Sequence, residues 1–116
     1  MRSLLLALAL FSLLLPVAAR AQTQSEMNAE AFGDFQAADK KMNVAYAKLM
    51  KALPDDEAQA KLKAAQIAWL KYRDTQAELE ADGSRGGTIV PTLLAETKAA
   101  LTDARTAELK KLAEAY

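Results

Sequence analysis

The stretch MNAEAFGDFQAADKKMNVAYAKLM, residues 27–50, carries the clearest structural signal in this chain of 116 residues. Its apolar and small residues recur at spacings of three and four, which places them on one face of an α-helix. The pattern predicts a first helix over residues 25–52, with Ser25 as its N-terminal cap. The expected inward face contains Met27, Ala31, Phe35, Ala38, Met42, Ala45 and Leu49.

A second helix is predicted after the first break. Residues 53–56, Leu-Pro-Asp-Asp, interrupt the first helix, and Asp55 or Asp56 can cap a second helix that runs to about Ala81. The expected inward face of this helix contains Leu62, Ala65, Trp69, Tyr72 and Leu79, with Gln76 interrupting it.

A third helix follows the segment DGSRGG, residues 82–87, in which three glycines and a serine disfavour a helix. Thr88 can cap the third helix, and Pro91 is tolerated in its first turn, where amide donors are unpaired anyway. Short breaks between long helices favour antiparallel neighbours, so the sequence predicts an all-α fold, an elongated up-down-up three-helix bundle. The third inward face should contain Leu94, Thr97, Leu101, Ala104 or Arg105, Leu109 and Leu112.

Residues 1–21 have the pattern of an export signal. Arg2 gives a positive start, residues 4–15 are almost wholly apolar, and Ala19-Arg20-Ala21 is typical of a cleavage site after Ala21. An uncleaved membrane anchor is the alternative, but the apolar run is about a dozen residues and a spanning helix needs roughly 20. We therefore expect a periplasmic or secreted domain of residues 22–116, with no stable membrane span after cleavage.

Composition excludes several classes of function. Fifteen basic residues balance fifteen acidic ones, and removing Arg2 and Arg20 leaves thirteen against fifteen, which argues against nucleic acid as a partner. The chain has no Cys and no His, so a thiol nucleophile, a His general base and a His/Cys metal site are ruled out. We predict no cofactor and no metal. A hydrolase would depend on carboxylates alone and is disfavoured.

A polar cross-section is expected in the middle of the bundle. In two antiparallel helices, residues at the same number of positions from the connecting break lie level with each other. Trp69 should therefore lie level with Asp39 across the first break and with Arg105 across the second. Arginine can pair with a carboxylate and stack on aromatic rings. The group is either a polar ligand site or a hydrogen-bonded layer that fixes helix register, and we favour the second. It contains Asp39, Trp69, Tyr72, Arg73, Thr102 and Arg105.

The segment 82–88 has two interpretations. It lacks both glycine-rich phosphate motifs, so the simpler one is a connector between helices. The other is a flexible probe in which Arg85, with Ser84 and Asp82, binds carboxylates on a partner. These three residues are the candidate partner-binding site.

The chain also contains a W-x-x-Y-R-D block at residues 69–74, a Gly-Gly-Thr sequence at residues 86–88 and T-x-x-R at residues 102–105. Together with several shorter matching pieces, these motifs make nearly all of residues 22–116 similar to the lysozyme inhibitor LprI-like N-terminal domain family. The resemblance implies an exported, helical bacterial envelope protein rather than an enzyme. The remaining matching pieces are residues 24–29, Ala38-Asp39, Met42-Asn43, Tyr46, residues 62–66, Glu108 and Leu109.

The resemblance also implies a difference from relatives, which usually carry cysteines at positions that correspond here to Glu30, Ala77 and Thr97. We expect all three near one end of the bundle, where a disulfide in relatives would join helices across the glycine segment.

Two partners are consistent with the resemblance. One is lysozyme, blocked by residues 82–88. The other is a different envelope protein, bound by a structural or adaptor module through an apolar patch of Phe32, Ile67 and Leu70.

Overall fold

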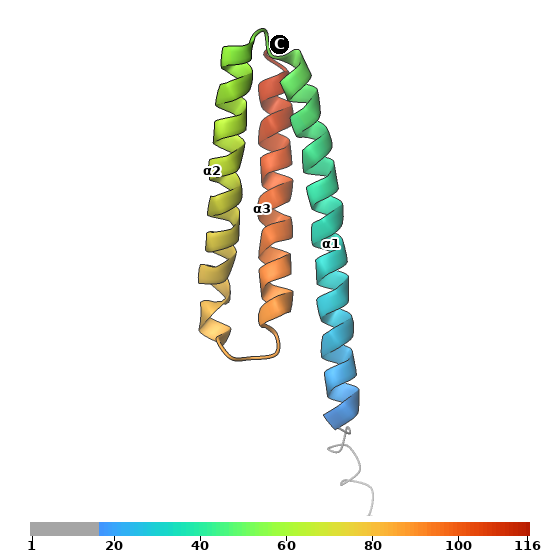
Figure 1. Cartoon of the computed structure of the whole chain (residues 1–116). Coiled ribbons are helices and arrows are strands. Elements are labelled where there is room, and N and C mark those ends of the chain that lie inside the picture. Colours follow the sequence, from blue (N-terminus) through green and yellow to red (C-terminus); the bar gives the residue numbers. More distant parts are fainter. Residues whose placement is uncertain (1–16) are drawn as a thin grey trace, which may run out of the picture.

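The computed structural model describes the backbone of residues 17–116 and the side chains from Thr23 onward. Three helices, α1 (Val17–Ala52), α2 (Asp56–Ala81) and α3 (Val90–Ala113), make up almost all of it, with a short 3-10 helix η1 (Asp82–Ser84) after α2. Figure 1 shows α1 and α3 running in the same direction, with α2 antiparallel to both. The predicted all-α, up-down-up bundle is confirmed.

Two of the predicted helix starts are wrong. Ser25 lies inside α1, which is continuous from Val17, because the alanine-rich residues that precede it also favour a helix. Ile89, not Thr88, occupies the N-cap of α3, and no side chain caps that end. Pro91 does lie in the first turn, as expected.

The second helix begins as predicted. Asp55 has extended backbone angles, and its side chain accepts a hydrogen bond from the Ala58 amide at 2.8 Å. Asp56 and Glu57 follow in the first turn, where the helix dipole favours negative charge.

The apolar run at residues 4–15 lies outside the described residues. Residues 17–21, which contain the expected cleavage site, form the start of α1, and Figure 1 shows this end of α1 extending past the loop between α2 and α3. Farther along, Gln24 and Asn28 of α1 both hydrogen-bond Thr92 at the start of α3. Cleavage after Ala21 would therefore leave these contacts in place, and it remains a prediction. Among residues 17–116, no helix is long and apolar enough to cross a membrane.

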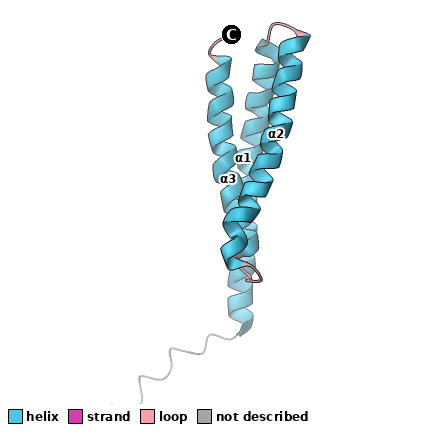
Figure 2. Cartoon of the chain, turned by 90° about the vertical axis from the view of Figure 1, so that its left-hand side faces the viewer, coloured by secondary structure: helices cyan, strands magenta, loops and turns pink. Residues whose placement is uncertain are grey.

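The hydrophobic core lies at the end of the bundle that contains the turn between α1 and α2. Its members are buried, and Trp69, Leu70 and Tyr46 pack against them. Figure 2 shows α2 and α3 converging at their connecting loop and diverging toward this end. The side chains of the hydrophobic core fill the wider space there. The core residues are Met42, Ala45, Leu49, Leu62 and Leu109.

The predicted inward face of α1 is largely correct, although Met27 is 42% exposed. In α2 the face is rotated, and Ala65, Tyr72 and Leu79 are exposed. In α3, Ala104 and Leu112 are exposed. The buried rows are Leu62, Gln66, Arg73, Ala77 and Ala81 in α2, and Thr92, Ala95, Thr102, Thr106 and Leu109 in α3.

Apart from Leu62 and Leu109, the residues in these rows are polar or small, and that explains the packing of the helices. α3 packs most extensively on α1, where alanines and threonines let two helices approach closely. α2 reaches α1 mainly through long side chains, as in the hydrogen bond from Gln66 Nε2 to Met42 Sδ at 3.4 Å. Three residues of α2 that we expected inside, Ala65, Tyr72 and Leu79, are displaced to the surface by these polar groups, whereas Leu62 stays in the core and Trp69 packs against it.

Candidate functional site

Arg73 is the centre of the polar layer. Its side chain is only 10% exposed, and its Nη1 donates to Asp39 Oδ1 at 3.2 Å while Nε donates to Asp74 Oδ1 at 2.9 Å. The guanidinium lies over two rings, 4.9 Å from the centroid of Phe35 and 5.6 Å from that of Trp69. Arg73 thus joins α2 to α1 by charge and by stacking.

A second arginine joins α3 to α2 in the same layer. The guanidinium of Arg105 lies 5.9 Å from the Trp69 ring centroid, and its Nε donates to Gln66 Oε1 at 3.0 Å. Its Nη1 also bonds Glu108 at 3.0 Å, one turn along α3. The Trp69 ring therefore lies close to two guanidinium groups, that of Arg73 on α2 and that of Arg105 on α3.

Of the six residues expected in this layer, the structure brings Asp39, Trp69, Arg73 and Arg105 into one connected group. Thr102 is fully buried on α3, and its Oγ1 has no hydrogen-bond partner among the described residues. Tyr72 is 50% exposed and lies outside the layer, because the rotation of α2 that turns Arg73 inward turns its neighbour outward.

Several members of the layer were missed. Gln66 precedes Arg73 by seven residues, and a polar heptad of this kind is a sequence signal that could have placed both on one face. Asp74 Oδ1 accepts the hydrogen bond from Arg73 Nε and also lies 3.9 Å from Lys98 Nζ. Lys98 in turn lies 5.8 Å from the Phe35 centroid. Arg73 donates to two carboxylates within the protein and its side chain is only 10% exposed, which favours the interpretation as a layer that fixes register.

The loop at residues 82–88 has a defined conformation. Arg85 Nε donates to Asp82 Oδ1 at 2.9 Å and Nη2 donates to Oδ2 at 2.6 Å, so one carboxylate holds the guanidinium at two points. Gly86 adopts φ +80°, a left-handed conformation that favours glycine. The Gly87 amide then donates to Ser84 O at 2.9 Å and closes the turn.

Arg85 is exposed but not free. Its side chain is 80% exposed, and the Asp82 hydrogen bonds raise the pKa of the guanidinium, outweighing the opposite effect of desolvation. The expected flexible probe is therefore a positioned cation. Ser84, the third residue of the candidate site, supplies its backbone carbonyl to the turn.

The three positions that the resemblance led us to match with cysteines of relatives lie in the half of the bundle near this loop. Ala77 is fully buried on α2, and Thr97 on α3 is half-buried. Asp74 meets Lys98 across the same two antiparallel helices, so Ala77 and Thr97 lie at nearly one level. Glu30 is exposed on α1 and lines a hollow with Thr92 and Glu96 of α3.

The expected apolar patch is not continuous. Leu70 is half-buried and packs against the core, while Phe32 and Ile67 are exposed. Because Gln66 meets Met42 across α1 and α2, Ile67 lies near that level. Phe32 is ten residues farther along α1, about 15 Å away at 1.5 Å per residue.

Among the described residues, no group of three or more His, Cys, Asp or Glu side chains could hold a metal ion. The fold and the site define a small helical bundle with an arginine-centred polar layer and a structured, charged loop.

The chain belongs to the family described as lysozyme inhibitor LprI, whose model matches residues 17–109. The resemblance seen in the sequence is thus confirmed. The chain is also similar to an uncharacterized protein of Rhizobium meliloti (strain 1021), with 39% identity over 111 residues that cover 85% of this chain and 80% of the relative. No solved structure matches.

Proposed function

We propose that this is an exported, non-enzymatic protein of the bacterial envelope that inhibits lysozyme through the loop at residues 82–88. Family membership over residues 17–109 supports the class of protein. The observation that carries the site is the two-point hold of Asp82 on the exposed Arg85. Of the two partners considered from the sequence, we favour lysozyme, because the apolar surface proposed for another partner is not continuous.

The chemistry of the loop suits the target. Lysozyme cleaves glycan with a pair of carboxylates in a cleft. A guanidinium has five N–H donors, and Asp82 uses two of those on Arg85, which leaves three for a carboxylate of the enzyme. Because Asp82 already fixes the side chain, less conformational entropy is lost on docking than for a freely rotating arginine.

The direct test is a cell-wall clearing assay. The full chain is expressed in a bacterial host, and the protein released from the periplasm is titrated against lysozyme. We expect inhibition, and Arg85→Ala should raise the half-inhibitory concentration by at least about tenfold, since a residue at the centre of an interface contributes roughly 2 kcal/mol or more. The matched control is Lys61→Ala, which removes an exposed cation that also pairs with a carboxylate, Glu57 at 3.1 Å.

A second variant tests the positioning of Arg85. Asp82→Asn keeps a polar side chain but removes the charge that holds the guanidinium, and we expect a smaller loss of inhibition than for Arg85→Ala. Circular dichroism checks that both variants keep their helix content. Absence of inhibition by the parent protein at micromolar excess would rule out this function.

A further inference from the structure

The surface formed by α1 and α3 has a segregated charge pattern. These helices run side by side in the same direction, and alanines form the floor of a groove between them. Most of the exposed charges along this groove form two groups of opposite sign. We call Glu30, Asp34 and Glu96 the acidic triad, and Lys41, Lys48 and Lys110 the lysine triad.

The acidic triad lies in the half of the groove near the loop. Asp34 of α1 and Glu96 of α3 line the same two adjoining hollows, and Glu30 lines the one closer to the loop. All three side chains are exposed, and within the described part of the chain none makes an ion pair. Asp103 of α3 lies farther along, toward the middle of the face.

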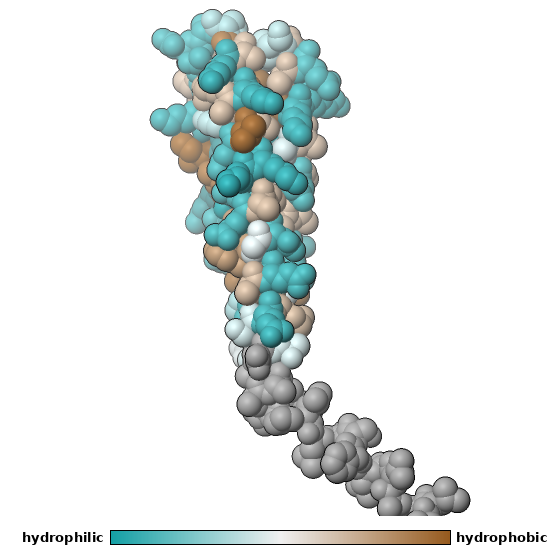
Figure 3. Space-filling view, turned by 90° about the vertical axis from the view of Figure 1, so that its right-hand side faces the viewer, coloured by the Kyte–Doolittle hydropathy of each residue, from teal (hydrophilic) through white to brown (hydrophobic). Residues whose placement is uncertain are grey.

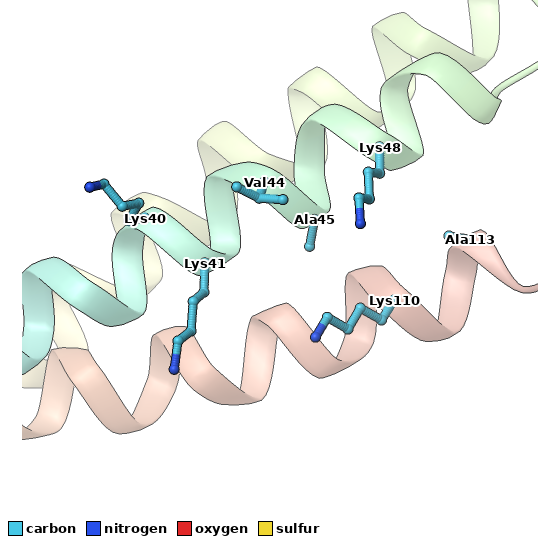
Figure 4. Close-up of a pocket in the computed structure, with 7 residues that line it drawn as sticks. All are labelled: Lys40, Lys41, Val44, Ala45, Lys48, Lys110 and Ala113. Atoms are coloured by element: carbon cyan, nitrogen blue, oxygen red, sulfur yellow. The ribbon is translucent and has the colours of Figure 1, made fainter.

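The lysine triad surrounds a hollow of about 530 Å³ in the other half of the groove. Figure 4 shows Lys41 and Lys48 extending from α1 toward α3, with Lys110 of α3 beside them, whereas Lys40 points away. Val44, Ala45 and Ala113 contribute the apolar part of the lining. No member of the triad makes an ion pair with another side chain that the structure describes.

We propose that a second copy of this chain docks antiparallel on the α1/α3 face, so that each acidic triad meets the lysine triad of the other copy. A two-fold axis makes every contact occur twice, which requires a self-complementary surface. With the axis near Ala38, residue 34 of one copy lies level with residue 42 of the other, and residue 30 with residue 46. These levels bring the acidic triad within reach of the flexible lysines.

The floor of the face permits close approach. Ala37, Ala38, Ala99 and Ala100 line its central part, and the side chains of Lys41 and Asp103 that share this lining are exposed and charged. Figure 3 shows mainly hydrophilic side chains on the α1 side of the molecule, with separate hydrophobic ones among them. Charge complementarity therefore decides the orientation, since a parallel arrangement would place like charges together.

The size of the face predicts a weak dimer. Residues 30–50 of α1 span about 30 Å at 1.5 Å per residue. Two helices of this length cover about 600 Å² on each copy, or about 1,200 Å² in total, at the lower limit of specific interfaces. We expect association in the micromolar range that weakens with salt, because exposed charges are screened. The loop at residues 82–88 is not part of this face, so the inference is independent of lysozyme inhibition.

The test is sedimentation velocity on protein purified after expression of the full chain, over a range of concentrations and at low and high salt. The parent protein should approach the dimer mass at high concentration in low salt and return to monomer in high salt. One variant reverses the lysine triad to Glu, and another reverses the acidic triad to Lys. Each should be monomeric alone, and an equimolar mixture should recover a heterodimer, because the two altered faces complement each other.

The matched control replaces Lys61, Lys63 and Lys71 with Glu. It changes the net charge by the same amount as the lysine-triad variant but alters only α2. It should dimerise like the parent protein. All the altered side chains are exposed, and circular dichroism checks the fold of each variant. A monomeric parent protein in low salt, dimerisation of either triad variant alone, or failure of the mixture to associate would overturn the proposal.

Discussion

Replacing Arg73 separates the two ways in which the polar layer can stabilise the bundle. The guanidinium bonds Asp39 and Asp74, and it also packs on the rings of Phe35 and Trp69. If the ion pairs dominate, any uncharged residue at this position is equally harmful. If packing dominates, Arg73→Met should be tolerated much better than Arg73→Ala.

The structure favours packing. Asp39 and Asp74 are 38% and 47% exposed, so water can solvate them when the arginine is removed, and each pair contributes about 1 kcal/mol or less. Burying the guanidinium carries a desolvation penalty that offsets this gain. The Cγ and Cδ methylenes of the stem contribute about 0.8 kcal/mol each, and methionine retains most of this contact while alanine loses it.

We therefore expect Arg73→Met to change the free energy of unfolding by no more than about 1 kcal/mol. Arg73→Ala should lower it by about 3 kcal/mol, including the cavity that it leaves. Urea denaturation followed by circular dichroism measures both. In thermal melts the two variants should differ by about 10 °C, since 1 kcal/mol corresponds to roughly 4–8 °C in a domain of this size.

The reasoning fails if Arg73→Met and Arg73→Ala unfold at the same urea concentration, because the charge would then outweigh the stem. Asp39→Asn provides the complementary measurement. It removes one partner of Arg73 and leaves the ring contacts, so it should lower the free energy of unfolding by about 1 kcal/mol.

Three further predictions concern other positions. Thr102→Val should raise the free energy of unfolding by about 1 kcal/mol in urea denaturation, because the buried Oγ1 has no hydrogen-bond partner among the described residues and its removal relieves a desolvation penalty; a loss of stability would contradict this. Ala77→Cys with Thr97→Cys should form a disulfide on oxidation, detected by loss of free thiols, and raise stability by about 2–4 kcal/mol for a loop of roughly 20 residues; persistently free thiols would refute the register. Gly86→Ala should destabilise the protein by about 1 kcal/mol because φ at Gly86 is +80°. Gly33→Ala should stabilise it by a similar amount, because Gly33 lies in a helix with open space around the added Cβ. Thermal melts that rank the two variants in the opposite order would contradict this prediction.

The number, order and direction of the helices could be predicted because each depends on local signals. Asp55 has the side chain that caps a helix, and Gly86 and Gly87 end the run of helix-favouring residues before α3. Levels across the bundle also followed from counting residues from the breaks. The observed contacts of Asp39 with Arg73, and of Trp69 with Arg105, are within a few residues of the expected levels.

The faces of α2 and α3 could not be predicted by placing apolar residues inside. Leu79 is exposed while Arg73 is buried, because the arginine contacts two half-exposed carboxylates and two aromatic rings, partners that a leucine cannot bind in this way. Such a choice depends on all three helices together, and the hydrophobic pattern of one helix does not contain it. Thr88 was mistaken for a cap for a related reason, since the turn of the preceding glycines sets where α3 begins.

The conformation of the loop at residues 82–88, the candidate site, could not be predicted from the sequence either. Its composition identified Arg85 as an exposed cation, but glycine content suggested flexibility, and the sequence does not reveal that the Asp82 carboxylate and the left-handed Gly86 fix it. An Asp three residues before an Arg is common on solvated helices. Only the 3-10 turn between them brings both carboxylate oxygens to the guanidinium.

The two interfaces of α3 explain how the bundle is held without a cysteine bridge. Against α1, small side chains such as Ala38 and Thr102 give close backbone approach, and this contact needs no long-range charge. Against α2, the spacing increases away from the loop, and Arg105 and Trp69 occupy the wider space. A disulfide at Ala77 and Thr97 would restrain α2 only near the loop. The arginine layer restrains it farther along, where the helices diverge, so the layer is needed whether or not relatives carry the bridge.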